Sequence, residues 1–237
     1  MYYNKYIKYK IKYLELKNQT EISTNEQYGG KKKSKKSKRI NKSNIKIFDE
    51  NNKIVDTHKN EHFEQSLAQQ HIKHDDKVLE LGARYGSVSV TINKILDNKK
   101  NHVVIEPDSR VWDALEKNKN INKCEFEIFK GLIGKKKYSL TNTDCYNGYG
   151  TTMIENENSS VESITLENLM TKHKINFNVL VVDCEGCFEI FLDENKDFIK
   201  NLRMIMYEAD YPQKCDYVKI ENILIDFIVN VKSDQIQ

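Results

Sequence analysis

The sequence predicts an α/β fold whose sheet is mostly parallel and covered by helices on both faces. Short apolar segments of strand length alternate along the chain with segments of helical periodicity. A glycine turn separates one such strand from the helix that follows, and the segment 177–182 is a nearly continuous apolar run, as expected of a strand buried on both faces. Because a repeated strand–helix–strand order joins parallel strands through crossover helices, these observations together predict this fold.

The distribution of charge divides the chain into two parts. Residues 1–46 hold 14 Lys or Arg against 3 Asp or Glu, a net charge of +11, and the remainder has a net charge of −8. We therefore predict a basic N-terminal extension over residues 1–46, disordered in part, and a folded domain over residues 47–237. A chain of 237 residues is long enough for one α/β domain and such an extension.

Two segments of the extension have patterns of their own. Ile7, Ile11 and Leu14 recur at helical spacing, so we expect residues 1–17 to form a short basic amphipathic helix. Residues 31–39 contain seven Lys or Arg, and like charges at that density repel one another and oppose folding. This run suits an anionic partner such as a nucleic acid, a nuclear-import signal or a solvated linker, and the sequence leaves these alternatives open.

The composition of the chain also indicates the cellular compartment in which we expect it. No segment approaches the roughly 20 apolar residues of a membrane span, and the first 17 residues lack the apolar core of a signal peptide. We therefore expect a soluble intracellular protein without a transmembrane segment. The five cysteines are an odd number without framework spacing, and Cys184 and Cys187 lack a second ligand pair at zinc spacing, so reduced thiols are expected.

The other elements follow from periodicity. Residues 45–55 suit a small strand pair, and Phe63, Leu67 and Ile72 recur on one side of a predicted helix. The glycine-containing stretch 131–155 is expected to form a hairpin and a loop placed to cover the mouth of a site. The predicted strands are 77–81, 102–105, 125–129, 177–182, 204–207 and 228–231, and the predicted helices are 62–72, 87–96, 111–118, 163–172 and 220–227.

The ten residues 78–87 contain the most informative turn. A buried strand ends there in a turn with Gly82 and Gly86 at its outer positions, and the next strand along the chain ends in Glu106. An acid at the tip of that neighbouring parallel strand can accept hydrogen bonds from two ribose hydroxyls. The sequence therefore predicts a nucleoside-cofactor site, with an ordinary turn that binds nothing as the alternative.

The residues inside this turn indicate which cofactor fits. A pyrophosphate requires glycines spaced G-x-G-x-x-G, whereas here the bulky Arg84 and Tyr85 stand between the two outer glycines. S-adenosylmethionine has a ribose and an adenine but no phosphate, so it needs the turn and the acid without the full phosphate cradle. The turn therefore favours S-adenosylmethionine over NAD.

Carboxylates follow the other predicted parallel strands as well. Asp183 and Glu185 come directly after the strand 177–182, and Glu208 follows the strand that ends in Tyr207. Because ligands of an open parallel sheet bind at the carboxyl ends of its strands, we expect these acids to meet Glu80 and Glu106 at one rim. Carboxylates gathered in this way repel one another unless donors, cations or a ligand compensate.

Several ordered motifs carry a resemblance to a known family: Leu79-Glu80-Leu81-Gly82-Ala83 with Gly86, Ile105-Glu106-Pro107-Asp108, Ile164-Thr165-Leu166-Glu167-Asn168-Leu169, Asp183-Cys184-Glu185-Gly186, and Glu208. Over about residues 61–217 the chain resembles the FkbM-type class I methyltransferases, which depend on S-adenosylmethionine. The resemblance implies a Rossmann-like sheet, mostly parallel, and methyl transfer to a hydroxyl of a sugar or another small metabolite. The chain departs from the family two residues after Gly186, where an acid is common: Phe188 stands there, and Glu189 lies one place further. Its end also leaves open whether the last strand of the family's sheet is present.

The resemblance also implies roles for individual residues. Glu106 would hold the ribose hydroxyls, and Asp183 or Glu185 would act as general base or hold the acceptor, although Asp183 could instead only cap the helix that follows. Two acids are too few to predict a divalent metal. The other implied cofactor contacts are Glu80, Gly82, Ala83, Gly86 and Pro107, with Gly131 and Leu132 at the adenine, and with Glu208 and Tyr207 at the rim beside the substrate.

A second resemblance concerns origin. The Tyr- and Lys-rich start, with Gly29-Gly30 before the lysine run, is similar to the N-termini of giant DNA virus proteins, which implies a location in the host cytoplasm or nucleus. The expected function is methylation of a small-molecule or glycan hydroxyl. An RNA or protein methyltransferase that captures its substrate with the basic extension is one alternative, and a non-enzymatic binding protein on the same fold is another. The sequence indicates neither the acceptor nor the oligomeric state.

Overall fold

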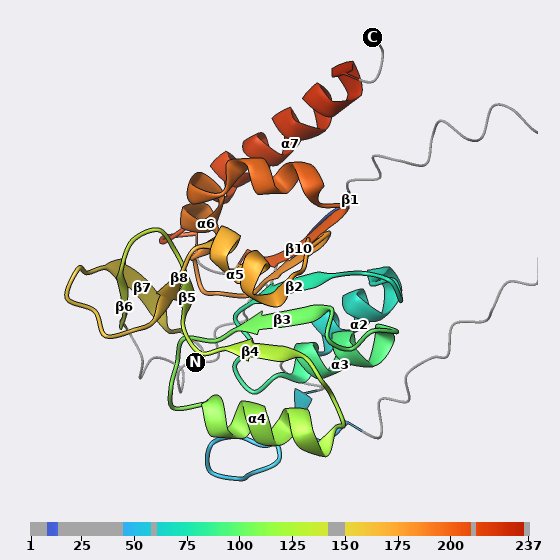
Figure 1. The fold of residues 1–237 in the computed structure, drawn as a ribbon, viewed down its shortest axis with the longest axis vertical. Helices are drawn as coiled ribbons and strands as arrows, with labels where there is room; N and C mark the ends of the chain where they lie inside the picture. The colour runs from blue at the N-terminus through green and yellow to red at the C-terminus, as the bar shows by residue number, and fades with distance from the viewer. Residues whose placement is uncertain (1–8, 14–44, 58–60, 142–149, 210–211, 235–237) are drawn as a thin grey trace, which may run out of the picture.

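The computed structural model describes residues 9–13, 45–57, 61–141, 150–209 and 212–234. A six-stranded sheet in the order β1-β10-β9-β2-β3-β4 forms its centre (Figure 1). The strands of this sheet are β1 (Tyr9–Tyr13), β2 (Val78–Leu81), β3 (His102–Ile105), β4 (Glu127–Phe129), β9 (Val179–Val182) and β10 (Met204–Glu208). The helices are α2 (His62–His71), α3 (Ser87–Ile95), α4 (Trp112–Ile121), α5 (Leu166–His173), α6 (Phe188–Glu194), the 3-10 helix η3 (Lys196–Asn201) and α7 (Tyr217–Asp234).

The five strands from β10 to β4 run parallel, which confirms the parallel sheet that the alternating pattern predicts. From β2 the chain moves outward through β3 to β4, and the later strands β9 and β10 are added on the other side of β2. The strand order therefore reverses between β2 and β9. In open α/β sheets a crevice forms at such a reversal, outside the carboxyl ends of the strands, and this is where ligands bind.

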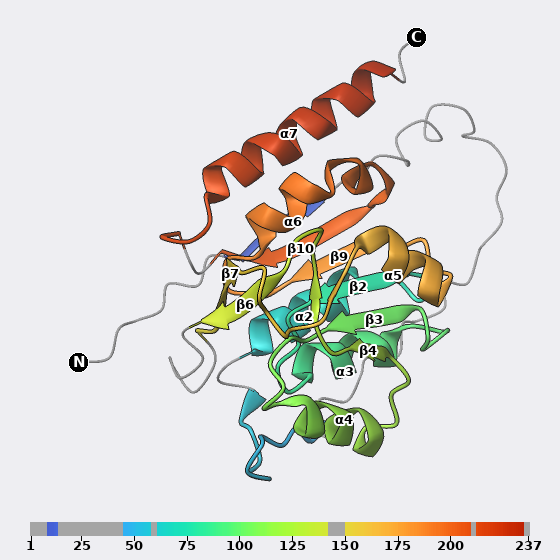
Figure 2. The same ribbon diagram turned by 60° about the vertical axis from the view of Figure 1, so that its left-hand side comes forward.

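Helices cover both faces of the sheet, as the sequence predicts (Figure 2). Apolar residues of α5, α6, η3 and α7 pack on one face, in a core that includes Leu180 and Ile205. On the other face α2 and α3 pack over Val78 and Val181, and α3 and α4 pack over Val104. Every residue of β2, β3 and β9 is buried, which is the reason that these strands are mostly apolar.

Four further strands of the described chain lie outside the central sheet. Strands β5 (Leu132–Ile133) and β8 (Ser163–Ile164) form a parallel pair, and β6 (Tyr138–Thr141) and β7 (Thr152–Glu155) form an antiparallel hairpin. The hairpin confirms the prediction for the stretch 131–155, while the predicted covering loop falls partly at 142–149, outside the described residues. The strand pair expected at 45–55 is reduced to one antiparallel bridge, between Phe48 and Ile54.

Two predicted elements have the wrong type of secondary structure. Tyr9–Tyr13 form strand β1, antiparallel to β10, where a helix over residues 1–17 is expected; residues 1–8 and 14–17 lie outside the described chain. Tyr and Ile alternate with Lys in this segment, which is a strand period, and the edge of β10 supplies the backbone partners that local periodicity does not reveal. The predicted strand 228–231 is wrong as well, since these residues continue α7.

Strand β1 forms the edge of the sheet next to β10, where the sequence analysis leaves open whether a last strand is present. Within the described residues no strand follows β10 along the chain, and the N-terminal segment supplies the antiparallel strand at this edge instead. Pairing along the edge removes a row of open backbone donors and acceptors from β10. None of the described helices, the long α7 included, is long and apolar enough to cross a membrane.

Candidate ligand-binding site

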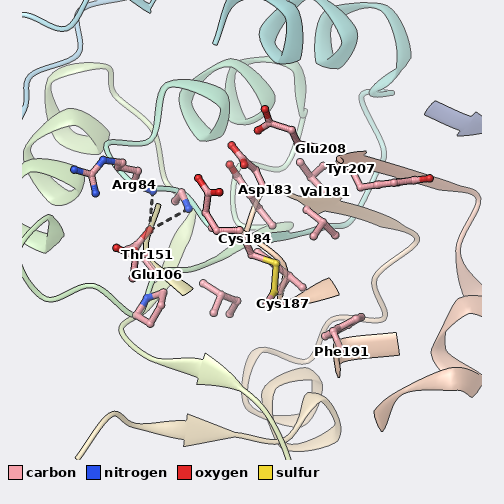
Figure 3. A pocket seen from close by; sticks show the side chains of 18 of the residues that line it. Arg84, Glu106, Thr151, Val181, Asp183, Cys184, Cys187, Phe191, Tyr207 and Glu208 are labelled. Atoms are coloured by element: carbon pink, nitrogen blue, oxygen red, sulfur yellow. Dashed lines mark hydrogen bonds between the residues drawn. A yellow bond between two sulfur atoms is a disulfide. The ribbon is translucent and has the colours of Figure 1, made fainter. Parts of the chain in front are cut away.

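A pocket lies where the strand order reverses, at the carboxyl ends of β2, β3, β9 and β10. Helix α2 and the β6–β7 hairpin contribute further walls, and most of the predicted site residues line it (Figure 3). Gly86 and Gly131 are the two predicted residues that do not. The predicted residues that line the pocket are Glu80, Gly82, Ala83, Glu106, Pro107, Leu132, Asp183, Glu185, Tyr207 and Glu208.

The turn after β2 depends on glycine at both of its outer positions. Gly82 has φ +84°, and a Cβ atom there would lie 1.8 Å from the carbonyl oxygen of Asp183. The turn is thus pressed against the backbone that leaves β9, which only a residue without a side chain allows. Gly86 has φ +80° and caps α3, where a Cβ would lie 2.6 Å from Leu115 Cδ1, so its role in this structure is to pack α3 against α4.

Glu106 holds this turn through its carboxylate. Its Oε2 accepts hydrogen bonds from the backbone N–H groups of Ala83 (3.1 Å) and Arg84 (2.7 Å), and Oε1 accepts one from Asp108 N–H (2.8 Å; Figure 3). Burial raises the pKa of this carboxyl group, although the three backbone donors act in the opposite direction. The sequence predicts a ligand contact here, and the structure adds that the same carboxylate organises the glycine turn.

Arg84, the cationic side chain of the turn, points away from Asp183. The guanidinium of Arg84 donates to the hydroxyl of Tyr85 (3.0 Å) and lies 3.8 Å from Asp108, and Figure 3 shows it turned away from Asp183. Asp108 is also paired with Arg110, and although burial alone would raise the pKa of its carboxyl group, these cations hold that pKa below its usual value. The guanidinium of Arg84 is thus paired outside the cluster of carboxylates, although its charge still acts to lower the pKa of Glu61.

The carboxylate of Glu80 is held in place by two buried polar side chains. Its side chain is only 1% exposed, and Ser89 Oγ donates to Oε1 at 2.9 Å while His102 Nε2 lies 2.8 Å from Oε2. Ser89 and His102 are themselves fully buried, on α3 and β3. A buried carboxylate is stable only when its oxygens have such partners, so this network explains a polar side chain inside an otherwise apolar strand. The resemblance implies a cofactor contact for Glu80, whereas in the structure its two carboxylate oxygens are bound by Ser89 and His102.

Three further carboxylates converge above β9 and β10. One oxygen atom each of Glu64, Asp183 and Glu208 lies within 4.8 Å of the others, and Figure 3 shows Asp183 and Glu208 side by side. The sequence analysis anticipates two of them and misses Glu64, which comes from α2. Three carboxylate oxygens at these distances could hold a hard cation such as Mg²⁺ or an ammonium group. Of the two acids considered as metal ligands from the sequence, Asp183 belongs to this cluster and Glu185 does not.

The face that α2 presents to the pocket differs from the prediction. Phe63, expected to point inward, is 56% exposed, whereas Glu64, Gln65 and Ala68 are buried. Leu67 and Ile72, on the same predicted side as Phe63, do pack against the core, so the difference is confined to the N-terminal turn of α2, which borders the acidic site. Glu61 and Glu64, spaced one helical turn apart ahead of the first parallel strand, were the available signal for this arrangement.

Glu61 lies at the start of α2 and accepts a hydrogen bond from Ser87 Oγ. Removal of its carboxyl group from solvent, followed by the negative charges of Asp183, Glu64 and Glu80, raises its pKa to about 8. Glu61 is therefore mostly protonated at neutral pH. A cationic ligand in the pocket would lower this pKa again and release a proton.

We expect the stability of Glu61→Gln relative to the parent protein to depend on pH. The pKa of the unfolded chain is near 4.5 and that of the folded protein is about 8, so the stabilisation from Glu61 is complete below pH 4.5 and lost as the pH rises through 8. Each pKa unit corresponds to about 1.4 kcal/mol, so the variant should be more stable by up to about 5 kcal/mol at pH 9 and by much less at pH 5. Urea unfolding at both pH values measures this, with the exposed Glu125→Gln as control. A difference that does not change with pH would contradict the shifted pKa.

Tyr207, which is expected at the rim beside the substrate, points into the core instead. The ring of Tyr207 packs between Phe188 and Tyr217, with the latter stacked at 6.2 Å, and Figure 3 shows it pointing away from Asp183 and Glu208. Burial raises its pKa to about 12, so its hydroxyl is a core group rather than a rim group. Tyr207 lies on the opposite side of β10 from the neighbouring Met206 because side chains alternate along a strand.

The backbone N–H groups of Gly131 and Leu132, which are expected near the adenine, are already hydrogen-bonded within the protein. Leu132 lines the pocket, but its N–H donates to the carbonyl of Glu162 at 2.8 Å, and Gly131 N–H donates to that of Phe129 at 3.1 Å. A Cβ on Gly131 would lie 2.3 Å from the carbonyl oxygen of Glu162, so this glycine allows the close approach of β8. Leu132 therefore offers the pocket an apolar side chain rather than a backbone donor.

The cysteines after β9 form a disulfide, whereas the sequence analysis expects thiols. Cys184 and Cys187 are bonded, with their Cα atoms 5.4 Å apart. Glu185 (φ +54°) and Gly186 (φ +95°) between them are both in the left-handed region, and this tight turn brings the two cysteines together. Spacing alone did not reveal the pairing, because it depends on the backbone of the turn.

No family model matches the sequence, and no curated protein matches it. The α/β fold with its parallel five-stranded sheet is established by the structure. The case for a function therefore depends on the geometry and charge of the pocket.

Proposed function

We propose that this chain is an S-adenosylmethionine-dependent methyltransferase of the FkbM type that methylates a hydroxyl group of a sugar or another small molecule. One observation carries the proposal: a glycine turn without a phosphate cradle opens into a pocket that is rich in carboxylates. A dinucleotide would bring a negatively charged pyrophosphate against Glu64, Asp183 and Glu208. S-adenosylmethionine instead carries a sulfonium and an ammonium group, which these carboxylates complement.

The residues that would hold the cofactor follow from the walls of the pocket. Glu106 would lie beside the ribose, because Oε1 has one backbone donor and each carboxylate oxygen can accept more than one hydrogen bond. Gly82 and Ala83 would pass close to the methionine part, and Glu61 and Glu64 lie where an ammonium group could be neutralised. Apolar side chains of Ile133, Val182 and Phe191 complete the lining and exclude water from part of the pocket.

When bound, S-adenosylmethionine supplies an electrophilic methyl group. The chain must then hold a hydroxyl oxygen about 3 Å away and in line, which accounts for much of the acceleration in such reactions. Asp183 and Glu185 are the candidates for the group that takes the hydroxyl proton, since both line the pocket at the end of β9. Asp183 is the stronger of the two because Glu64 and Glu208 surround it with negative charge, which favours acceptance of a proton.

Methyl transfer and cofactor binding test the proposal together. We expect the full chain to bind S-adenosylmethionine in a calorimeter and to transfer a radiolabelled methyl group to members of a panel of sugars and small alcohols. Asp183→Asn should lower transfer by about 100-fold or more while the dissociation constant of the cofactor changes by only a few fold. Glu185→Gln identifies the base if Asp183→Asn leaves transfer intact.

Asp193→Asn is the matched control, because Asp193 lies on α6, pairs with Lys219 and does not line the pocket. Folded protein that binds neither S-adenosylmethionine nor its demethylated product would exclude the proposal and favour a non-enzymatic binding protein.

The second candidate function is methylation of RNA or protein, because the basic run at 31–39 could capture such a substrate. Replacement of its seven Lys and Arg residues by Gln separates the two. Transfer to a small hydroxyl acceptor should be unaffected, whereas capture of RNA would weaken and lose most of its dependence on salt.

A further inference from the structure

The Cys184–Cys187 disulfide is part of the pocket wall. Both cysteines line the pocket and both are only partly buried, so a small reagent that enters the pocket can reach them (Figure 3). The bond joins the residue after Asp183 to the residue that precedes α6. The site residues Asp183 and Glu185 therefore stand beside or inside the loop that the disulfide closes.

This loop has a backbone that the disulfide helps to hold. Glu185 has a left-handed φ of +54°, a conformation that costs a residue with a side chain roughly 1 kcal/mol or more. Gly186 follows at φ +95°, and it packs against Lys214 and Cys215. Cleavage of the sulfur–sulfur bond removes the restraint that keeps two consecutive residues in this region. Glu185 is then free to return to an extended or right-handed conformation, which moves its carboxylate.

The loop is also coupled to the glycine turn. Asp183 N–H donates to the carbonyl of Leu81 at 2.9 Å, and the Asp183 carbonyl lies against Gly82 so closely that a Cβ there would be 1.8 Å away. Glu106 in turn binds the next two N–H groups of the same turn. A change in the backbone after Asp183 is therefore transmitted directly to the turn that shapes the pocket.

We propose that Cys184 and Cys187 form a redox-active pair that exchanges with a dithiol, and that its oxidation state sets the affinity of the pocket for its ligand. A thiolate of the dithiol attacks one cysteine sulfur and displaces the other as a thiolate, which takes up a proton. The second thiol of the reagent then displaces the first cysteine from the mixed disulfide. Two electrons and two protons pass to the protein, which gains two thiols, and the dithiol becomes a cyclic disulfide.

The redox step is measured without reference to any ligand. The protein is equilibrated in buffers of reduced and oxidised dithiothreitol, alkylated, and analysed by peptide mass spectrometry. We expect Cys184 and Cys187 to change together from protected to alkylated, whereas Cys124, buried in the core on the other face, keeps its thiol throughout. Resistance of the bond to reduction in the folded protein would overturn the proposal.

The effect on the pocket is measured with S-adenosylmethionine as the probe, and this part rests on the proposed function. We expect calorimetry to give dissociation constants that differ by about fivefold or more between the oxidised and reduced protein. A Cys184→Ser/Cys187→Ser double variant should match the reduced protein under both conditions, and Cys124→Ser should respond like the parent. Equal affinity in all these forms would overturn the redox control.

If no form binds S-adenosylmethionine, the proposed function fails and hydrogen exchange decides the redox inference separately. Amides of residues 81–86 and 183–188 should exchange faster in the reduced protein and in the double variant than in the oxidised protein. Identical exchange in these segments would show that the disulfide does not organise the pocket.

Discussion

Gly82→Ala is expected to abolish ligand binding and to destabilise the fold by about 3 to 5 kcal/mol, from the left-handed backbone and from overpacking together. The new Cβ would lie 1.8 Å from the carbonyl oxygen of Asp183 and 2.7 Å from its carbonyl carbon. These are backbone atoms of neighbouring segments at the ends of β2 and β9, so neither can move without disturbing the parallel ladder. Urea unfolding and calorimetric titration with S-adenosylmethionine measure the two effects.

Gly186→Ala is the matched control for this substitution. Gly186 also has a positive φ, of +95°, but the nearest atom to an added Cβ is Lys214 Cβ at 3.1 Å. Its cost should therefore be mainly conformational, about 1 to 2 kcal/mol. If the two variants were equally stable, the close approach of the turn to Asp183 would not exist in solution.

Glu106→Ala is expected to lower the unfolding free energy by about 3 kcal/mol and to weaken cofactor binding at least tenfold, because truncation of a buried acceptor leaves its donors unsatisfied. The donors are the N–H groups of Ala83, Arg84 and Asp108. The loss in binding has two sources, the disordered turn and the missing partner of the ribose. Thermal and urea unfolding report the first, and calorimetry reports their sum.

Glu106→Gln separates these contributions in part. Glutamine keeps one carbonyl oxygen for Ala83 and Arg84 but turns an NH₂ group toward Asp108 N–H, so stability should fall by less than in the alanine variant. Glu125→Ala, at an exposed position ahead of β4, should change neither quantity. Unchanged stability in Glu106→Ala would contradict the role of this carboxylate in the turn, and unchanged affinity would remove it from the cofactor site.

The elements that the sequence predicts well are those whose neighbours lie close along the chain. Strand β3 spans the predicted residues 102–105, and β2 with α3 begins and ends within one residue of the prediction. Their apolar periods are strong, and Gly82 and Gly86 mark the turn between them. Local physical chemistry is sufficient here, because these segments are largely buried and their apolar residues follow the period of the element that they form.

Two of the errors share one cause, which is a partner distant in sequence. Tyr9–Tyr13 pair with β10, almost 200 residues away, and a short alternating segment gives no sign of that edge. Phe63 is exposed because α2 turns Glu64 toward the pocket. In both cases tertiary contacts outweigh a weak local pattern. The error at residues 228–231 is of another kind, because these residues continue the helix α7 that precedes them.

The acids after the strands, Glu106, Asp183 and Glu208, could be placed at one rim from the sequence, because parallel strands bring their carboxyl ends to the same edge. Periodicity and the glycine turn were likewise enough for the α/β fold and for a pocket without a phosphate cradle. Only the tertiary structure joined Glu61 and Glu64 to these acids, turned Tyr207 into the core and paired Cys184 with Cys187. The physical reason is that strand direction follows from local order along the chain, whereas the rotation of a helix and the path of a turn depend on packing against segments far away in sequence.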